Sequence, residues 1–169
     1  HQRAGLYTLP GGAPDTVVGA ELHQGKELSF NNLADADAAL RGLKAVGDTK
    51  PVQTGETAPN GAAPRTVAPL DFLRGALCLN SQYKRVGGCT KLRVDGWAHH
   101  AYTRRDGPLV LPVERLVTVG ALSRLTDALD RAAKTGAVKR KLKVYLTEFG
   151  VQSVPDPNYG VSLQQQNEF

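Results

Sequence analysis

The amino-acid sequence predicts an α/β fold with a parallel sheet, and three observations support this prediction. After residue 30, helical patterns alternate with short β-type runs in the order helix, strand, helix, strand, helix, strand. The chain has 169 residues, the size of one domain, and 41% of them are hydrophobic, enough for a core. Gly and Pro are frequent, at 18 and 10 residues, without a low-complexity pattern. We therefore expect residues 1–169 to be a single domain or a fragment of one.

The N-terminal part of the chain has the weakest pattern. Residues 1–30 are interrupted repeatedly by turn-forming residues, so we expect an irregular segment there and βα units over residues 31–169; the interrupting residues are Pro10, Gly11, Gly12, Pro14, Gly19 and Gly25. Residues 32–46 predict the first helix, which Asn32 can cap and Gly47 can end. Residues 51–55 predict a short strand, followed by a loop over residues 56–61.

The remaining elements follow from apolar spacing. Residues 69–77 predict a helix with Leu70, Leu73 and Leu77 on one side. Residues 92–102 predict a strand that runs into a loop, and residues 118–135 give the clearest helix, with Gly136 at its C-terminal end. Residues 143–149 predict a strand, and the tail from residue 155 predicts a loop with a helix starting at Ser162.

Cys78 and Cys89 are the only cysteines and flank a short polar loop. This arrangement favours a disulfide, and with it a secreted, extracellular protein, over two buried free thiols in a cytosolic one. A lone cysteine pair lacks the partner ligands of a structural zinc, so we expect no metal.

The charge balance permits an anionic partner without requiring one. The net charge is +5 with a pI near 9.4, and the densest basic cluster is Lys139–Lys141 with Lys143. Nucleic-acid binding would require this cluster to share a face with Arg104 or Arg105, and a solvated loop is the favoured interpretation. We expect no membrane partner, because no run approaches the ~20 apolar residues of a membrane span. Residues 1–6 lack the apolar segment of a signal peptide, so the signal of a secreted chain would already be removed.

Polar side chains stand where each of the three predicted strands ends. Glu56 lies at the end of the first strand, and Glu148 lies at the end of the third. The second strand ends with His99, His100 and Tyr102. In parallel α/β folds, active sites form outside the carboxyl ends of the strands. A single strand-end carboxylate is usually tied to a basic residue or to loop amides. Three consecutive strands with the same feature favour a functional site.

The run Leu146-Thr-Glu-Phe-Gly150 resembles the nucleophile strand of retaining (β/α)8-barrel glycoside hydrolases of the large cellulase-like clan. His100-Ala-Tyr102 is similar to the His-x-Tyr signature one strand earlier in that clan, and the resemblance covers residues 33–169. It implies a partial TIM-type barrel whose strands correspond to about five to seven. It also implies a secreted glycosidase that cleaves β-linked polysaccharide or oligosaccharide and needs no cofactor.

The resemblance implies a role for each strand-end residue. Glu148 would be the catalytic nucleophile, Tyr102 would hydrogen-bond its carboxylate, and His100 would bind a sugar hydroxyl or orient Tyr102. Retaining hydrolysis needs a second carboxylate about 5–5.5 Å from the nucleophile. Glu56, His99 and Trp97 are the candidate substrate-binding residues, and Glu56 is also a candidate substitute acid.

The chain departs from the family pattern in two respects. The Asn-Glu pair that carries the acid/base in the clan does not occur upstream of Lys50, and a full barrel takes about 250 residues. Half a barrel has exposed sheet edges, so we expect another chain or another copy to complete the sheet. The alternative is a non-catalytic carbohydrate-binding or interaction module on the same scaffold. The sequence leaves open the sugar, the linkage, endo or exo action, and the location of the acid/base carboxylate.

Overall fold

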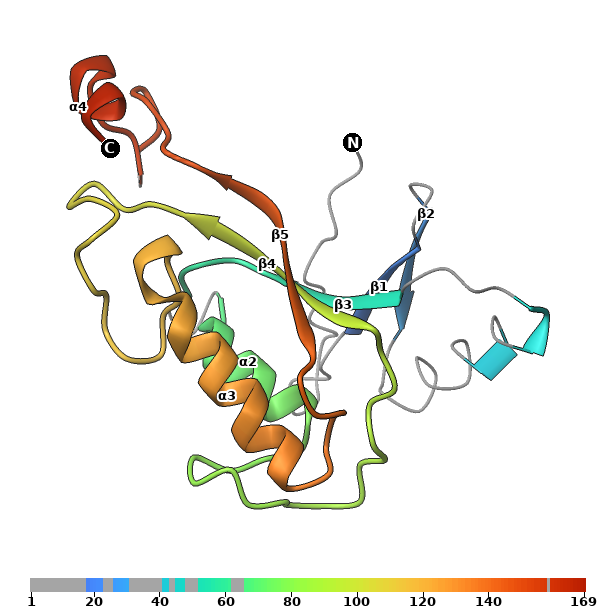
Figure 1. Ribbon diagram of the computed structural model, residues 1–169. Coiled ribbons are helices and arrows are strands. Elements are labelled where there is room, and N and C mark those ends of the chain that lie inside the picture. Colours follow the sequence, from blue (N-terminus) through green and yellow to red (C-terminus); the bar gives the residue numbers. More distant parts are fainter. Residues whose placement is uncertain are drawn as a thin grey trace.

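In a computed structural model of the chain, the structure describes residues 18–22, 26–30, 41–42, 45–47, 52–61, 66–157 and 159–169. These residues contain a five-stranded sheet with helices beside it (Figure 1). The strands are β1 (Val18–Leu22), β2 (Lys26–Phe30), β3 (Val52–Thr57), β4 (Gly96–Tyr102) and β5 (Lys143–Gly150). The helices are α2 (Pro69–Ala76), α3 (Leu122–Lys134), which follows a 3-10 turn over Val119–Ala121, and α4 (Leu163–Glu168).

The sheet is mixed, with strand order β2-β1-β3-β4-β5. Strands β3, β4 and β5 are parallel, whereas β1 pairs antiparallel with both β2 and β3. The α/β class and the parallel pairing predicted from the sequence are therefore confirmed. Over the described ranges the sheet is open, with β2 and β5 at its edges, and no closed barrel is present.

Of the two N-terminal predictions, one is wrong and the other falls mostly on residues that the structure does not describe. Residues 18–30, expected to be irregular, contain the strands of an antiparallel pair in which Leu22 faces Lys26. The helix expected over residues 32–46 lies largely outside the described residues, although Arg41, Gly42 and Ala45 are helical. The later expectations agree with α2, α3, β3 and β5, and the second parallel strand begins at Gly96 rather than at residue 92.

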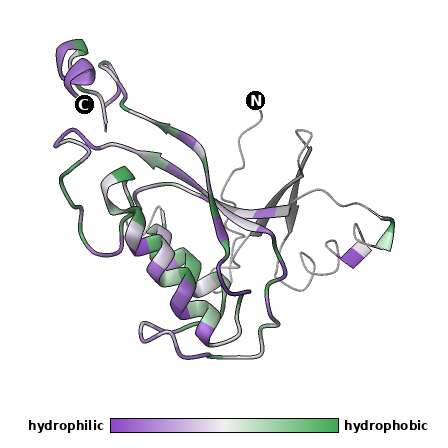
Figure 2. Ribbon diagram, viewed as in Figure 1, coloured by the Kyte–Doolittle hydropathy of each residue, from purple (hydrophilic) through white to green (hydrophobic). Residues whose placement is uncertain are grey.

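Helix α3 forms because its apolar residues recur at helical spacing and pack against the sheet. Its buried residues are Leu125, Ala128, Leu129 and Ala132. In Figure 2, α3 carries both hydrophobic and hydrophilic stretches, whereas α4 is mostly hydrophilic. The helix ends at Lys134. Gly136 lies just beyond its cap with a φ of 78°, which suits glycine, and the Gly136 N–H donates to the Ala133 carbonyl.

Helix α2 covers the same part of the core. Pro69 occupies its first turn, where the missing N–H costs nothing, and Asp71 lies there as well. Leu73 is fully buried, and Phe72 meets Trp97 of β4 edge-to-face with ring centroids 6.4 Å apart. The two helices therefore bury one face of the sheet around Trp97 (Figure 1).

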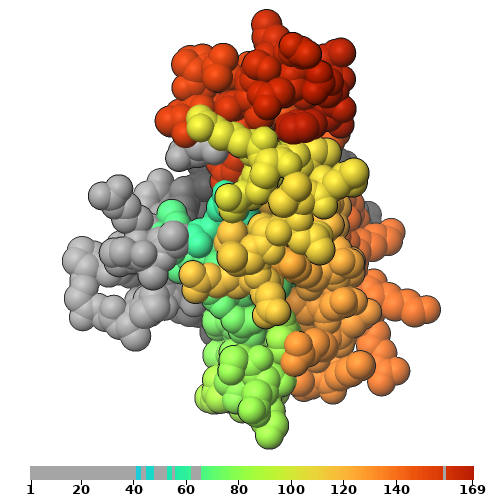
Figure 3. Space-filling view, turned by 90° about the vertical axis from the view of Figure 1, so that its left-hand side faces the viewer, coloured from blue at the N-terminus to red at the C-terminus, as the bar shows by residue number. Residues whose placement is uncertain are grey.

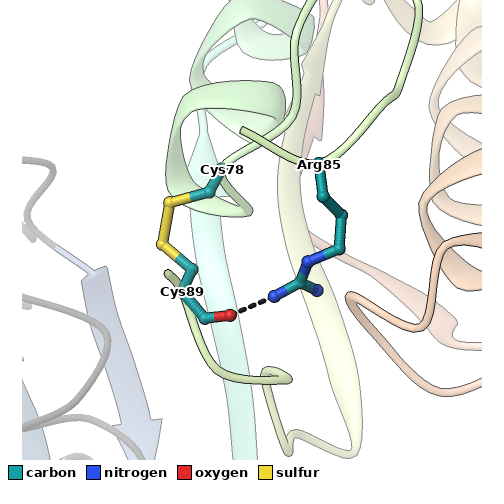
Figure 4. The surroundings of a disulfide bond; sticks show 3 residues. All are labelled: Cys78, Arg85 and Cys89. Carbon is teal, nitrogen blue, oxygen red and sulfur yellow. Dashed lines mark hydrogen bonds between the residues drawn. A yellow bond between two sulfur atoms is a disulfide. The ribbon is translucent and has the colours of Figure 1, made fainter. Parts of the chain in front are cut away.

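Cys78 and Cys89 form a disulfide that closes the loop after α2 (Figure 4). Their Cα atoms lie 5.9 Å apart, and the Arg85 guanidinium donates to the Cys89 carbonyl within the same loop. Arg131 of α3 stacks over the Tyr83 ring at 4.0 Å and anchors the loop to the helix. The extracellular location expected from this cysteine pair stays a prediction.

The C-terminal segment lies against the loop that follows β4 (Figure 3). The Arg105 guanidinium donates to the carbonyls of Asp156 and Pro157 at 3.2 and 3.0 Å. Helix α4 begins at the predicted place, because Ser162 and Gln165 form a reciprocal capping box. None of the helices in the described ranges is long and apolar enough to cross a membrane.

Candidate acid–base site

Four strand-end side chains meet at the carboxyl end of the parallel strands. Tyr102 of β4 donates its hydroxyl hydrogen to Glu148 Oε2 of β5 at 2.7 Å. The His100 imidazole lies between two carboxylates: Nδ1 is 3.6 Å from Glu148 Oε2, and Nε2 is 3.7 Å from Glu56 Oε1. These contacts are ion pairs when His100 is protonated. The structure thus brings together four residues that the sequence analysis singled out, one from β3, two from β4 and one from β5.

An irregularity on each side of β4 aims the carboxylates at His100. Between Gly55 and Thr57 the register of β3 against β4 shifts, which leaves Glu56 as the extra residue. On the other side His99 pairs with Leu146 and His100 with Glu148, so β5 also contains one extra residue. Bulges re-aim side chains and are frequent beside active sites. Glu56 has a φ of 52°, a conformation that few non-glycine residues adopt, which is a further sign of a functional constraint.

Three side chains of the site are partly exposed to solvent. The exposed fraction is 20% for the His100 side chain, 23% for Glu56 and 47% for Glu148. The cluster offers a phenol, an imidazole and two carboxylates, which together can donate and accept protons. Contacts of 3.6 to 3.7 Å around His100 exceed hydrogen-bond length, and such contacts in ligand-free acid–base sites often tighten when a substrate binds.

His99 and Trp97 lie on the opposite, helix-facing side of β4, because side chains alternate along a strand. His99 has no exposed surface and Trp97 is 1% exposed. His99 Nε2 lies 2.8 Å from the Val117 carbonyl, which can only accept, so this nitrogen carries the proton. His99 Nδ1 then accepts from the Thr57 hydroxyl at 2.8 Å. Two of the three proposed substrate-binding residues, His99 and Trp97, therefore belong to the core and do not reach the carboxylate cluster.

Burial affects the ionisation of His99. Loss of solvent lowers the pKa of His99 below 6.5; the Val117 hydrogen bond opposes this shift and the neighbouring His100 charge reinforces it. A neutral imidazole can make hydrogen bonds with both Thr57 and Val117. The Trp97 indole N–H also donates to the Thr57 hydroxyl oxygen, at 3.4 Å. His99 thus links β4 to Thr57 of β3 and to the segment that carries Val117.

Sequence reasoning missed Asn60 and Tyr159, which lie beyond β3 and β5. The Asn60 amide donates to the Tyr159 hydroxyl at 2.7 Å, a contact between residues 99 positions apart. Burial raises the pKa of Tyr159, and the Asn60 hydrogen bond works against that rise. Within the described residues, Asn60 Oδ1 is buried without a hydrogen-bond partner. The Pro-Asn-Gly sequence around Asn60 indicates only a turn, so its long-range contact leaves no signal in the sequence.

Metal binding gains no support from this cluster. Over the described part of the chain, no group of three or more His, Cys, Asp or Glu residues is arranged to hold a metal ion.

Comparison with known proteins finds similarity to proteins of purine biosynthesis. Residues 1–81 match the family model described as AICARFT/IMPCHase bienzyme. Relatives named Bifunctional purine biosynthesis protein PurH include one from Dinoroseobacter shibae, 31% identical over 157 residues, which is 93% of this chain and 27% of the relative. The one from Ruegeria pomeroyi is 27% identical over 98% of this chain and 28% of its own length. One from Listeria monocytogenes is 51% identical over 41 residues, which is 24% of this chain and 8% of the relative.

Two facts limit these similarities. The chain spans about a quarter of the length of the two relatives that it matches along most of its own length. No solved structure matches the chain.

These findings contradict the resemblance to retaining glycoside hydrolases. The glycosidase activity, its carbohydrate-binding alternative and the carbohydrate partner are wrong, because the similarity is to purine-biosynthesis proteins. The expectation of a second chain that completes a barrel is withdrawn with them. The motifs that suggested a glycosidase are short, and a strand-end carboxylate beside a His-x-Tyr pair specifies acid–base geometry without specifying a substrate. The chain resembles, over residues 1–81 and more weakly over most of its length, the bifunctional proteins of purine biosynthesis.

Proposed function

We propose that this chain acts in purine biosynthesis on a nucleotide-type substrate, as part of a protein of the AICAR transformylase/IMP cyclohydrolase kind. The observation that carries the proposal is the match of residues 1–81 to the bienzyme family model. The 31% identity to the Dinoroseobacter shibae protein over 93% of this chain supports it.

The acid–base site suits the chemistry that these names denote. Formyl transfer to an amine requires a base to remove the amine proton and an acid to protonate the leaving group. Ring closure with loss of water likewise requires a general base and a general acid. The hydroxyl of Tyr102, the imidazole of His100 and the carboxylates of Glu56 and Glu148 supply donors and acceptors within one cluster.

The geometry supports a different role for each of these residues. We propose that His100 exchanges a proton with the substrate, because its ring lies between the two carboxylates and can be stabilised by either when charged. Glu148 orients that ring from β5 and is itself held by the Tyr102 hydroxyl of β4, and Glu56 orients the ring from the bulge in β3. Asn60, with a buried carbonyl oxygen that has no partner among the described residues, is a candidate to accept from a substrate N–H or hydroxyl.

Activity measurements on the purified 169-residue chain test this proposal. Formylation of the aminoimidazole carboxamide ribonucleotide and cyclisation of its product are followed by absorbance for the wild type, His100→Asn and Glu148→Gln. Removing a general acid or base lowers kcat by about 10²–10⁴-fold. Glu114→Gln, which alters an exposed carboxylate in the loop after β4, serves as the matched control and should leave kcat unchanged.

Three outcomes would contradict the proposal. The first is equal kcat in wild type and His100→Asn, which removes the acid–base role. The second is a folded wild-type chain that turns over neither substrate. The third is the absence of calorimetric binding of either nucleotide to that folded chain.

The partial barrel is also retained as a proposal for β3, β4, β5, α2 and α3. Its support is the parallel pairing of three strands, each successive pair joined by a helix. Open doubly wound sheets share that arrangement.

A further inference from the structure

We propose that the amino end of the parallel strands is a docking surface for a lipid bilayer that carries anionic headgroups. Two segments form this surface: residues 77–95, which lead from α2 to β4, and residues 130–143, which lead from the end of α3 to the start of β5. Together they contain ten of the 21 Lys and Arg residues but only two of the 16 Asp and Glu residues. The positive net charge of the chain therefore comes from these two segments, which we call the basic end.

The two segments of the basic end form one surface, opposite the acid–base site. Strands β4 and β5 both start there because they are parallel, and α2 and α3 both end there (Figure 1). The Leu92 N–H donates to the Ala137 carbonyl at 2.8 Å. The Arg131 guanidinium lies over the Tyr83 ring, 4.0 Å from its centroid. These contacts hold the first segment against the second.

Six cationic side chains of the basic end are exposed, and no carboxylate of the described residues forms an ion pair with them. They are Lys84, Lys91, Lys134, Arg140, Lys141 and Lys143. The other four cations, Arg85, Arg93, Arg131 and Lys139, already interact with other groups of the protein and are not counted. The proposal rests on the six exposed cations alone.

The loop that carries Lys84 is held in one shape. The disulfide between Cys78 and Cys89 closes the loop, and the Asn80 side-chain oxygen accepts from the N–H groups of Gln82 and Lys84 at 2.9 Å. Figure 3 shows this loop projecting at the lower end of the molecule. An ordered, projecting loop can meet a flat surface without first having to fold.

The composition of the basic end fits a bilayer surface better than a nucleic acid. Single-stranded nucleic acids stack on exposed aromatic rings, but Tyr83, the aromatic residue of the two segments, is only 6% exposed. A nucleic-acid surface also needs a basic stripe, whereas Arg104 and Arg105 lie beyond the opposite end of β4. Val86 in the projecting loop is 48% exposed, and an apolar side chain beside cations suits the headgroup region of a bilayer.

Electrostatic attraction of this size is sufficient for peripheral binding, which requires no membrane-spanning segment. Each Lys or Arg residue near an anionic bilayer strengthens the partitioning of a protein onto it by about fivefold. The seven residues of β4, at about 3.3 Å each, place the acid–base cluster roughly 20 Å from the basic end. Docking therefore leaves that cluster uncovered, and the inference does not rest on the proposed function.

Co-sedimentation of the full chain with lipid vesicles tests the inference. The wild type should bind vesicles of phosphatidylcholine that contain about 30% phosphatidylserine, and should not bind vesicles of phosphatidylcholine alone. Raising the NaCl concentration from about 0.1 M to about 0.5 M should release the protein, because salt screens exposed charges.

Two triple variants with the same net charge show whether the basic end makes the contact. The first carries Lys84→Gln, Lys141→Gln and Lys143→Gln, and should bind the anionic vesicles about 10²-fold more weakly, since each lost charge contributes about fivefold. The control carries Arg104→Gln, Arg105→Gln and Arg115→Gln, which lie in the loop between β4 and α3, at the other end of the sheet. It should bind like the wild type. Circular dichroism melts confirm that both variants are folded.

A site-resolved measurement locates the contact on the wild-type chain. Acetylation of lysines, read by mass spectrometry, should be suppressed at Lys84 and Lys141 by the anionic vesicles and unchanged by vesicles of phosphatidylcholine alone. Unchanged acetylation of both lysines on the anionic vesicles would contradict the assignment of the basic end as the docking surface.

Three further results would overturn the inference. Equal loss of binding in the two triple variants would show that net charge, rather than the basic end, attracts the bilayer. Binding that persists undiminished at about 0.5 M NaCl would exclude attraction between exposed charges. Tighter binding of a duplex of about 20 base pairs than of the anionic vesicles, with the same loss in the first triple variant, would identify a nucleic-acid surface.

Discussion

Lowering the pH should destabilise the protein through His99. Burial lowers the pKa of the folded-state imidazole below 6.5, while the unfolded chain titrates near 6.5. Between these two values the unfolded state binds one more proton than the folded state, so the free energy of unfolding falls as the pH falls. The contribution is fully present above pH 6.5 and is lost as the pH drops toward the folded-state pKa.

The size of this effect follows from proton linkage. If the folded imidazole stays neutral throughout, an unfolded pKa of about 6.5 makes the loss between pH 7.5 and 5.5 about 1.4 kcal/mol. With a urea m-value of about 2 kcal/mol per molar, the unfolding midpoint should fall by about 0.7 M. Urea titrations followed by tryptophan fluorescence measure this shift, because Trp97 is the sole tryptophan and lies in the core.

Two variants isolate the His99 contribution. His99→Gln removes the titrating group, and its midpoint should shift less than that of the wild type by about the amount calculated above. His100→Asn removes the neighbouring imidazole, which is 20% exposed, and should keep most of the wild-type shift. An unchanged pH dependence in His99→Gln would refute the assignment of a neutral, buried His99.

Three further predictions concern stability. Replacing Cys78 and Cys89 by serine should lower the free energy of unfolding in urea by about 3 kcal/mol, since the bridge closes a loop with a sequence separation of 11; an unchanged midpoint would contradict this. Leu125→Ala should cost about 2–5 kcal/mol in the same assay because the side chain is fully buried, whereas Leu163→Ala, at a residue 71% exposed, should stay within about 0.5 kcal/mol. Ser162→Ala should cost about 1 kcal/mol of local helix stability, visible as faster amide hydrogen exchange in α4, and equal exchange rates would argue against the capping box.

Local signals in the sequence predict the elements whose causes are local. Helix α3 follows from its apolar spacing and its terminal Gly136, and α4 follows from Ser162, whose partner Gln165 is three residues away. The antiparallel strands β1 and β2 were missed because Gly19 and Gly25 were interpreted as loop residues. Their pairing depends on contacts between segments that single-segment patterns do not contain.

In the candidate site, too, the sequence predicts what depends on local position and misses what depends on contacts between strands. Strand-end position correctly groups Glu56, His100, Tyr102 and Glu148, because parallel strands end at one edge of the sheet. It also included His99 as a substrate-binding candidate, although strand alternation predicts that two adjacent histidines point to opposite faces. The bulges that direct the carboxylates toward His100 are shifts in the register between strands, so they cannot be predicted from the sequence of one strand. The substrate class could not be predicted either, because it depends on groups outside the five-residue motif around Glu148.

The left-handed backbone at Glu56 has a consequence for how this protein can evolve. A non-glycine residue in that conformation costs about 1–2 kcal/mol, which glycine would recover. The same substitution would remove one of the two carboxylates that face His100. Selection for stability alone would therefore favour loss of Glu56, so retention of glutamate here among descendants of this chain would be a record of selection for activity.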